Sequence, residues 1–302
     1  MVDITHKSNT LRIATAQAIV KVSSQATIDA IQNDTVPKGN VFAMSKAAGL
    51  LGVKKTPELL PDCHPMPIEF TGVTYEIEDL TVLIKVTVKT IYKTGVEVEA
   101  MHGASIVALN MYDMLKPIDK GVEIQTIKLL QKKGGKSSFP VKNVAELVGG
   151  IIVCSDTISK GIGEDKSGKL IKEKLDGFGL QTKEVTIIPD DIEMIRSQVL
   201  DLKETCNLIV ITGGTGISPR DNTPEAVLPL IDKRLIGVEE TIRRYGQERT
   251  PFAMLSRSVV GTIGNRLIVC LPGSSKGVVE SLDAILPHLF HGYTVLKGVR
   301  QS

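Results

Sequence analysis

The amino-acid sequence predicts two domains of different class, an α+β domain followed by an α/β domain. Its 302 residues are more than one domain usually holds. In the first half, helical periodicity is mixed with strands that alternate apolar and polar residues, which is typical of an antiparallel sheet. In the second half, short apolar strands alternate with helices, which predicts a doubly wound, mostly parallel sheet. We place the domains at residues 1–138 and 149–302, with a linker at 139–148.

The composition argues against several classes of protein. Hydrophobic residues make up 42% and charged residues 23% of the chain, as in an ordinary globular protein. The formal net charge of +2 argues against a nucleic-acid-binding protein with a large basic surface. The four cysteines form no CxxC pair, which indicates reduced thiols rather than disulfides or a zinc site. Because we find no apolar signal core and no run of about 18 apolar residues, we expect a soluble, cytoplasmic protein without a membrane partner.

The expected elements of the first domain are helices mixed with antiparallel strands. Residues 81–91 alternate cleanly between apolar and polar side chains, and with residues 69–76 they predict an antiparallel hairpin. A long helix is expected from residue 94 to 115 or 116, begun by a capping box of Thr94 and Glu97. The other expected elements are a strand at 14–23, helices at 24–33 and 40–51, a proline-rich loop at 60–67 and a strand at 122–130.

The second domain is expected to alternate strands with helices. The expected elements are strands at 151–154, 183–188, 208–212 and 266–271, and helices at about 169–177, up to about 202, and at about 277–286. In a doubly wound sheet the carboxyl ends of the strands lie along one edge, and ligands bind there. The polar residues that follow these strands are therefore the candidates for a binding site.

A glycine-rich turn follows the strand at 208–212. Gly213, Gly214 and Gly216 come directly after these apolar and β-branched residues, and Asp221 comes soon afterwards. Glycines in this position let the backbone turn sharply and bring its N–H groups close to a ligand. The spacing is neither GxGxxG nor that of a P-loop, so those two phosphate-binding motifs are excluded. An ordinary tight turn after a core strand is the alternative interpretation.

Aspartates and a second polar loop follow the other strands. Asp156 and Asp190 each follow a predicted strand, and Pro272–Lys276 follows the last one. Together with Asp221, these carboxylates could hold Mg²⁺ through an incomplete shell that leaves room for phosphate oxygens. The amides of the glycine turn and the polar groups of the second loop could bind the phosphates. The alternative is that each aspartate caps the next helix, and for Asp191 we favour this interpretation.

The first domain carries cations near its loops and element ends. They are Lys38, Lys54, Lys55, Lys116, Lys132, Lys133 and Lys136. His64 lies between prolines, and Asp113 lies three residues before Lys116, so that these two share a helix face. Solvated lysines and a local hydrogen bond of the histidine are the alternative interpretation. Taken together, the set suits a polyanionic phosphorylated substrate that requires proton transfers.

Several separate motifs of the first half recur together in one known family. They are Lys38–Ala43, Leu60–Pro65, Lys93–Ala100, Tyr112–Met114 and Gly134–Ser137. On these motifs, residues 1–138 resemble cyclic pyranopterin monophosphate synthase of the MoaC type, which implies a ferredoxin-like α+β fold. The family converts 3′,8-cyclo-7,8-dihydro-GTP into cyclic pyranopterin monophosphate and releases pyrophosphate.

The resemblance implies roles for residues of the first half. Asp113 and Lys116 would form the central acid/base pair. The groups that would hold the triphosphate or the pterin are Lys38, His64 and Lys132, supported by Lys54 and Lys136. Glu97 and Glu99 would line the pocket near the pterin. Asn40, Asp62 and His102 depart from the usual family sequence, and none of them removes a proposed catalytic group.

The second half also contains the motifs of a known family. They are Ser155–Asp156, Asp165–Gly168, Pro189–Asp190, Thr212–Gly216, Arg220–Ala226, Ser256–Arg257 and Leu271–Gly273. On these motifs, residues 149–302 resemble molybdopterin adenylyltransferase of the MogA/MoaB type. That family transfers AMP from Mg-ATP to molybdopterin and releases pyrophosphate. The resemblance therefore implies Mg²⁺ and ATP as a co-substrate, and no permanently bound cofactor.

Roles in the second half follow from the same resemblance. Asp190 and Asp221 match the catalytic, metal-binding aspartates, and Asp156 is a further substrate-binding candidate. The phosphate contacts would come from Gly213, Gly214, Thr215, Gly216, Gly273, Ser274, Ser275 and Lys276. One departure is Gly216–Pro219, which stands where some members have a second basic residue before Arg220.

The two resemblances indicate neighbouring steps of one pathway, so we expect a bifunctional protein of molybdenum cofactor biosynthesis. Its partners would be the small-molecule substrates and further copies of the chain, because the first family forms hexamers with sites at subunit interfaces and the second commonly forms trimers. One alternative is that the second half only binds pterins or assists assembly, and that the first half alone is active. A nucleotide-binding regulatory module is the alternative for the first half.

Overall fold

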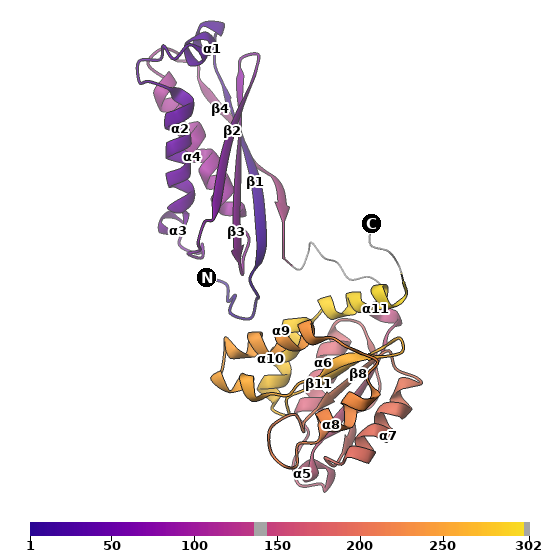
Figure 1. Cartoon of the computed structure of the whole chain (residues 1–302). Coiled ribbons are helices and arrows are strands. Elements are labelled where there is room, and N and C mark those ends of the chain that lie inside the picture. Colours follow the sequence, from indigo (N-terminus) through magenta and orange to yellow (C-terminus); the bar gives the residue numbers. More distant parts are fainter. Residues whose placement is uncertain (136–143, 299–302) are drawn as a thin grey trace. The chain divides into compact units, whose positions relative to one another are not determined.

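The chain forms two compact units, Met1–Pro140 and Val141–Ser302 (Figure 1). The computed structural model describes residues 1–135 and 144–298. The predicted end of the first domain at 138, the first part of the predicted linker and the candidate Lys136 lie outside the described residues.

The first unit contains a four-stranded antiparallel sheet. Its strands lie in the order β2-β3-β1-β4, and they pair antiparallel throughout. The strands are β1 (Thr10–Lys21), β2 (Phe70–Glu78), β3 (Thr81–Tyr92) and β4 (Glu123–Lys133). Alternate residues of β1 and β3 are fully buried, which explains why the clean alternation in the sequence predicted this sheet. The hairpin expected at 69–76 and 81–91 is confirmed.

Helices cover one face of this sheet (Figure 1). They are α1 (Gln25–Gln32), α2 (Val41–Lys54), α3 (Thr56–Leu59) and α4 (Glu97–Leu115). The buried side chains of β1 are small (Ala14, Ala16 and Ala18), so the long helix α4 can lie close to the sheet. A Cβ atom at Gly49 of α2 would overlap the side chain of Val107 in α4, so the backbone of α2 lies directly against this side chain.

One predicted feature of the first unit is wrong. Helix α4 begins at Glu97, with Val96 at its N-cap, and the capping box of Thr94 and Glu97 does not form. Val96 is fully buried, and this packing fixes where the helix begins. Glu97 is therefore the first helical residue, one position from the cap, whereas a capping box requires the glutamate at the third position. Its carboxylate lies instead 3.3 Å from the ammonium group of Lys132.

The second unit contains a mostly parallel sheet in the order β6-β5-β8-β11-β10-β9, with β7 also paired to β5. The central pairs are parallel, and β10 and β9 continue the sheet antiparallel. The strands are β5 (Val148–Cys154), β6 (Gln181–Thr182), β7 (Thr186–Ile188), β8 (Leu208–Thr212), β9 (Lys233–Arg234), β10 (Val260–Ile263) and β11 (Arg266–Leu271). The strand expected at 183–188 is shorter than predicted, because β6 and β7 are separate.

Helices lie on both faces of the second sheet (Figure 1). They are α5 (Asp156–Ser159), α6 (Ser167–Gly177), α7 (Ile192–Lys203), α8 (Thr223–Val227), α9 (Ile236–Gln247), α10 (Ser275–Ile285) and α11 (His291–Leu296). Neighbouring strand residues enter opposite cores: Ile151 packs with α6 and α10, whereas Ile152 packs with α7. This burial on both faces explains the continuous apolar runs and confirms the doubly wound class.

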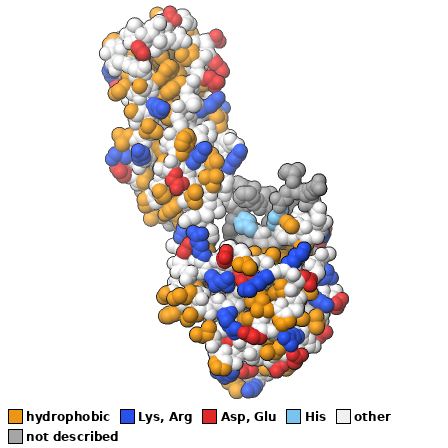
Figure 2. Space-filling view, viewed as in Figure 1, with side chains coloured by type: hydrophobic (Ala, Val, Ile, Leu, Met, Phe, Trp, Pro, Cys, Tyr) orange, Lys and Arg blue, Asp and Glu red, His pale blue; other side chains and the backbone are white. Residues whose placement is uncertain are grey.

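The surface and the cysteines agree with the composition. Figure 2 shows acidic and basic side chains mixed over the visible face of each unit. All four cysteines lie in the described part of the chain and are free. Among the described helices, none is long and apolar enough to span a bilayer. Leu147, in the described part of the predicted linker, is buried in the core of the second unit.

Candidate functional site

One polar cluster of the first unit lies at the C-terminal end of α4. The carboxylate of Asp113 lies 2.6 Å from the ammonium group of Lys38 and 2.7 Å from that of Lys116. Lys38 also donates to the backbone carbonyl of Asp113, at 2.9 Å. Hydrogen bonds from Lys116 and Lys38 lower the pKa of Asp113 to about 2, and the carboxylate in turn raises the pKa of Lys116. At neutral pH this cluster therefore holds a carboxylate between two ammonium groups.

A second cluster lies beyond the N-terminal end of the same helix. A cavity of about 660 Å³ is lined by Cys63, His64, Thr94 and Glu99. The Nε2 atom of His64 lies 2.8 Å from the carbonyl oxygen of Val2. His64 thus lines this cavity, and its ring is hydrogen-bonded to the N-terminal segment.

Glu99 is the buried carboxylate of this cluster. Only 2% of its surface is exposed, and the thiol of Cys63 donates a hydrogen bond to its Oε1 atom, at 3.0 Å. Burial and this carboxylate raise the pKa of Cys63 to about 12, so the thiol stays protonated and acts as a donor. The other oxygen of Glu99 has no hydrogen-bond partner among the described residues. A buried oxygen without a partner suits a ligand that brings a donor.

These two clusters lie far apart within one chain. Glu97 and Asp113 belong to the same helix, sixteen residues apart, which corresponds to about 24 Å along its axis. Helix α2 runs alongside in the opposite direction, since Lys38 precedes it and contacts Asp113, whereas Thr56 follows it and contacts His102 at 3.0 Å. Lys54, at the last turn of α2, therefore lies toward the half of α4 that carries Glu97. Within residues 1–135, one copy of the chain therefore does not bring the predicted groups of the first unit into a single site.

The second unit brings its predicted groups together at the carboxyl ends of β5, β7, β8 and β11. A cavity of about 330 Å³ is lined by residues from all of the predicted loops. They include Asp156, Ser167, Asp190, Gly213, Gly214, Arg220, Asp221 and Gly273. The parallel topology produces this convergence, because it places the ends of these strands along one edge.

The carboxylates of this cavity repel one another. Burial, together with the charges of Asp221 and Asp156, raises the pKa of Asp190 to about 6. The Oδ1 atom of Asp190 is buried and has no hydrogen-bond partner among the described residues. Asp221 accepts a hydrogen bond from the backbone N–H of Ser218, at 2.7 Å. Asp191 caps α7 by accepting from Met194, at 2.9 Å, as its alternative interpretation predicted.

These carboxylates fit a divalent cation that shares its coordination shell with a substrate. The unpartnered oxygen of Asp190 and the mutual repulsion would both be relieved by a positive ion. Within residues 1–135 and 144–298, no group of three or more His, Cys, Asp or Glu side chains is arranged to hold a metal ion by itself. Mg²⁺ commonly takes one or two carboxylates together with substrate phosphates and water, which matches such a site.

The glycine turn requires glycine at two positions. Gly213 and Gly214 have φ angles of 99° and 61°. A Cβ atom at Gly213 would overlap the carbonyl oxygen of Cys154, and one at Gly214 would overlap the carboxylate of Asp190. The backbone of the turn therefore lies directly against the acidic cavity. Thr215 is buried, and its hydroxyl lies 3.5 Å from the carbonyl oxygen of Leu271.

A second cavity, of about 450 Å³, adjoins the acidic one. Both cavities share Gly214, Asp221 and Gly273 as lining residues. The second is also lined by the apolar side chains of Ile217, Phe252 and Leu255, which are 70%, 73% and 48% exposed. Two ligands, one in each cavity, could thus meet at the shared wall, where the carboxylate of Asp221 lies.

The loop after β11 begins a helix. Ser274 caps α10 by accepting a hydrogen bond from the N–H of Gly277, at 3.1 Å. Ser275 is the first residue of α10, and the ammonium group of Lys276 lies 3.8 Å from the carboxylate of Glu280. The N-terminus of this helix borders the second cavity through Ser274, and free N–H groups at such a terminus favour an anion.

Two residues near the site lie in motifs of the second half, Asp165–Gly168 and Ser256–Arg257, but received no role from the sequence. The hydroxyl of Ser167 donates to the carbonyl of Gly273, at 2.9 Å, and thereby connects α6 to the loop after β11. Arg257 contacts the loop of the glycine turn, although it is about forty residues away in the sequence. Both contacts join segments that are far apart in the sequence, so the motifs alone do not reveal them.

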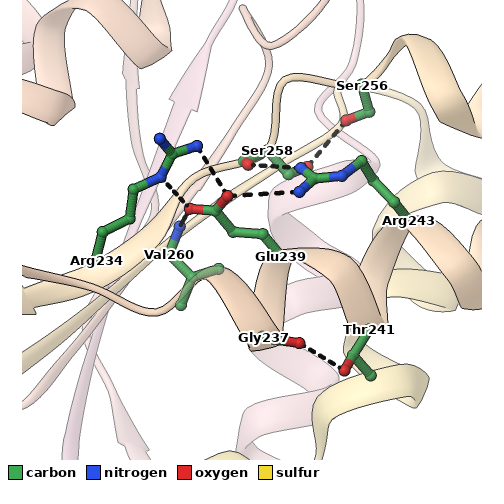
Figure 3. A network of polar contacts seen from close by, with 8 residues as sticks. All are labelled: Arg234, Gly237, Glu239, Thr241, Arg243, Ser256, Ser258 and Val260. Carbon is green, nitrogen blue, oxygen red and sulfur yellow. Dashed lines mark hydrogen bonds and ion pairs between the residues drawn. The ribbon is translucent and has the colours of Figure 1, made fainter.

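A buried ion network supports the segment around Arg257 (Figure 3). The carboxylate of Glu239 is fully buried, and Arg234 binds both of its oxygens, at 2.8 and 2.9 Å. Arg243 lies 3.5 Å from the same carboxylate and donates to the carbonyl of Ser258, at 3.3 Å. Burial disfavours the charged form, but the hydrogen bonds of Arg234 and of the Val260 amide outweigh it and lower the pKa of Glu239. The carboxylate therefore stays ionised at neutral pH.

Comparison with known proteins covers both units. The profile of the MoaC family matches residues 1–135, and the profile described as a probable molybdopterin binding domain matches residues 150–291. A molybdenum cofactor biosynthesis bifunctional protein of Chlorobaculum tepidum is 39% identical over 299 residues, which are 99% of this chain and 95% of that protein. A protein of the same description from Synechococcus elongatus is 34% identical over 99% of this chain and 98% of its own length.

The chain belongs to the family of bifunctional molybdenum cofactor biosynthesis proteins.

Each half of this bifunctional family member also has separate relatives. A probable cyclic pyranopterin monophosphate synthase of Archaeoglobus fulgidus is 44% identical over 144 residues, which are 45% of this chain and 92% of that protein. The crystal structure of the molybdopterin biosynthesis enzyme MoaB from Thermus thermophilus is 40% identical, with a TM-score of 0.47 over 52% of this chain and 99% of that one. The two family profiles confirm a MoaC domain over residues 1–135 and a probable molybdopterin binding domain over residues 150–291.

Proposed function

We propose that the two units catalyse two separate steps of molybdenum cofactor biosynthesis. Residues 1–138 would convert 3′,8-cyclo-7,8-dihydro-GTP into cyclic pyranopterin monophosphate and pyrophosphate. Residues 149–302 would transfer AMP from ATP to molybdopterin and release pyrophosphate. Membership of the bifunctional family supports both assignments, and the acidic cavity of the second unit is the observation that supports catalysis there.

The first active site would be assembled from two copies of the chain. Asp113, Lys38 and Lys116 lie at one end of α4, and the cavity with His64 and Glu99 lies at the other. Two copies related by a twofold axis, with their α4 helices antiparallel, would bring unlike ends together twice and form two equal sites. Each site would then combine a lysine-rich end for the phosphates with the buried carboxylate of Glu99 for donors on the pterin ring.

In such a site the acid/base work belongs to the Asp113 cluster. Lys116 is held as an ammonium group by Asp113, so it is a proton donor within reach of a bound phosphorylated substrate. Transfer of that proton would leave a neutral amine beside the carboxylate, and this amine can then take a proton back. Lys38, Lys132 and His64 would hold the substrate, with Lys54 and Lys136 in support.

Complementation between variants tests this assembly. Asp113→Asn and His64→Ala chains, each inactive alone, are mixed so that subunits exchange. We expect about a quarter of the wild-type activity, because random pairing makes half of the dimers mixed and each mixed dimer has one intact site. Asp113→Asn mixed with Lys116→Ala is the matched control, and it should stay inactive because both changes affect the same end. Failure of the first mixture, with mixed dimers demonstrated, would contradict a shared site.

The second active site would bind one fused-ring substrate in each of the two adjoining cavities. The phosphates of both would meet at the wall formed by Gly214, Asp221 and Gly273. Amides of the glycine turn and the N-terminus of α10 would bind phosphate oxygens, together with Ser274, which lines the second cavity, and with Ser275 and Lys276 in the first turn of α10. Asp190 and Asp221 would hold Mg²⁺, which supplies neutralising charge to the phosphates of ATP.

The alternative function of the second unit is binding of molybdopterin without catalysis. The unpartnered oxygen of Asp190 favours catalysis, because a pterin-binding module has no need for crowded carboxylates beside its phosphate-binding turn. Pyrophosphate release with molybdopterin and Mg-ATP distinguishes the two functions. Release that disappears in Asp221→Asn supports the transferase, whereas binding of molybdopterin without release supports the module.

The assembly would follow the symmetry of both families. A hexamer accommodates the twofold contacts that the first site requires and the trimers common for the second domain. Light scattering of the full chain measures its mass. A monomer at assay concentrations would contradict the shared first site.

A further inference from the structure

The loop between β8 and α8 carries several of the groups that the proposed second site requires. Residues 213–222 contain no helix or strand, yet they carry the phosphate-binding glycine turn and Asp221. Within the loop, Ser218 and Asp221 bind each other through a backbone bond of 2.9 Å and a side-chain bond of 2.7 Å. That local turn fixes the shape of the second half of the loop, but it does not attach the loop to the rest of the domain.

The two ends of the loop are attached by hydrogen bonds from the N–H of Gly213 to the carbonyl of Leu271 and from the amide group of Asn222 to the carbonyl of Asp190. Arg257 attaches the segment between them, with three branches of one side chain. Its Nε atom donates to the carbonyl of Gly216, and its Nη2 atom donates to the carbonyl of Asp221, both at 2.7 Å. Its Nη1 atom forms an ion pair with the carboxylate of Glu225 in the first turns of α8. The backbone N–H of Arg257 also donates to Thr215, at 2.8 Å. One residue thus joins the beginning of the loop, its end and the helix that follows.

The guanidinium group suits this arrangement for a geometric reason. It is planar and carries five N–H donors in fixed directions, so the three acceptors it binds are held in one plane. A lysine at the same position has a single nitrogen and cannot reproduce the three contacts together. The hydrogen bond from Arg257 lowers the pKa of Glu225, so the ion pair persists at neutral pH.

The residues on both sides of Arg257 are themselves fixed. The hydroxyls of Ser256 and Ser258 lie 2.9 Å apart, and Ser258 is 1% exposed. The carbonyl of Ser258 accepts from Arg243, which belongs to the network around the buried carboxylate of Glu239 (Figure 3). Arg257 therefore extends from a rigid base to a loop that lacks regular structure.

We propose that Arg257 is a positioning residue that fixes Asp221 and the glycine turn relative to the acidic cavity. The inference rests on the proposed adenylyl transfer, to which it adds a residue without a previous role. Arg257 contacts carbonyl groups and Glu225, and it acts on the reaction through the loop. Its loss lets the loop shift while the strands beneath keep their places.

Steady-state kinetics of the full chain measure the effect on the reaction. Arg257→Ala should lower kcat for pyrophosphate release from molybdopterin and Mg-ATP about 100-fold, since displacing a catalytic group by about 1 Å has an effect of this size. The KM for ATP should change by a smaller factor than kcat, because Arg257 acts only through the loop and contacts no group of the nucleotide itself. The kcat of Arg257→Lys should lie between those of Arg257→Ala and wild type, since lysine keeps one of the three contacts.

Hydrogen exchange gives a readout that does not depend on activity. In Arg257→Ala, the amides of Ser218 and Asp221 should exchange faster, while those of β8 and β11 keep the wild-type rate. Arg196→Ala is the matched control. Arg196 binds the carbonyls of Glu225 and Ala226, both at 3.3 Å, so it contacts the same helix α8 and leaves the loop alone. This control should keep its kcat and the exchange of the loop.

The two measurements separate the inference from the proposed function. A wild-type chain that releases no pyrophosphate defeats the proposed transfer, and exchange then decides alone whether Arg257 holds the loop. An active wild type with unchanged kcat in Arg257→Ala overturns the inference, and so does loop exchange equal to that of wild type. Where the alanine variant unfolds, Arg257→Lys is judged by the same criteria.

Discussion

Asp190 should make the folded second domain less stable at neutral pH, and replacing it with asparagine should stabilise that domain. Burial and the charges of Asp221 and Asp156 raise the pKa of Asp190 from 3.8 to about 6. A carboxyl group with a raised pKa binds its proton more tightly in the folded state than in the unfolded state. The contribution to stability is therefore complete below pH 4 and is lost as the pH rises through 6.

The size of the effect follows from the same shift. Roughly two pKa units correspond to about 3 kcal/mol of free energy of unfolding. Asp190 is only partly buried, and solvent screens part of the repulsion, so we expect about 1–2 kcal/mol. Asparagine has nearly the same shape and carries no charge, and its amide group can donate toward Asp221. For a domain of this size the gain corresponds to about 3–6 °C in Tm.

Thermal unfolding of the full chain in a metal chelator measures this gain. The transition of the second domain in Asp190→Asn should rise above that of wild type at pH 8, and the two should converge at pH 4. Asp191→Asn is the control, since Asn caps a helix as well as Asp does and this carboxylate is not in the acidic cavity. The reasoning is refuted if Asp190→Asn is destabilised at pH 8, or if its gain is the same at pH 4 and pH 8.

Three further predictions concern other residues. Glu239→Gln should lower the free energy of unfolding of the second domain by about 2–4 kcal/mol, because it leaves two arginines facing a neutral amide. Denaturant titration measures this loss, and an unchanged midpoint would refute the prediction. Cys63 should react with iodoacetamide at pH 8 about 10³-fold more slowly than a free cysteine, because its pKa is about 12. The rate is followed by mass spectrometry, and the rate of a free cysteine would contradict the raised pKa of this thiol. Gly213→Ala should abolish the activity of the second unit and leave that of the first unchanged, because a methyl group there overlaps the carbonyl of Cys154. Separate assays of the two activities measure this, and retained adenylyl transfer would argue against a rigid turn.

The convergence at the second site could be predicted because parallel topology determines it. Once strands and helices alternate, the residues after each strand must share one edge, so Asp156, Asp190 and Asp221 could be brought together without a structure. The edge of the sheet formed by β9 and β10 could not be predicted in this way. β9 has only two residues, and it is held by its pairing with β10 and by the ion pair of Arg234 with the buried Glu239, both of which tertiary packing creates.

The first unit shows a different limit of sequence reasoning. The period of two in β3 and the helical pattern before Asp113 were sufficient for the elements. The start of α4 was predicted three residues too early from a local capping motif, because burial of Val96 outweighs this motif and determines where the helix begins. The roles of His64 and Asp113 came from family resemblance, and only the structure shows that they occupy opposite ends of the helix.

The proposed function requires that the assembled protein has two independent kinds of active site, one for each unit. Pyrophosphate release by the intact protein tests it most directly, measured once with cyclic dihydro-GTP and once with molybdopterin and Mg-ATP. Asp113→Asn and Asp221→Asn are assayed beside wild type. We predict release in both assays, with each variant losing only its own. Release in the first assay alone, or loss of both activities in either variant, would contradict the claim.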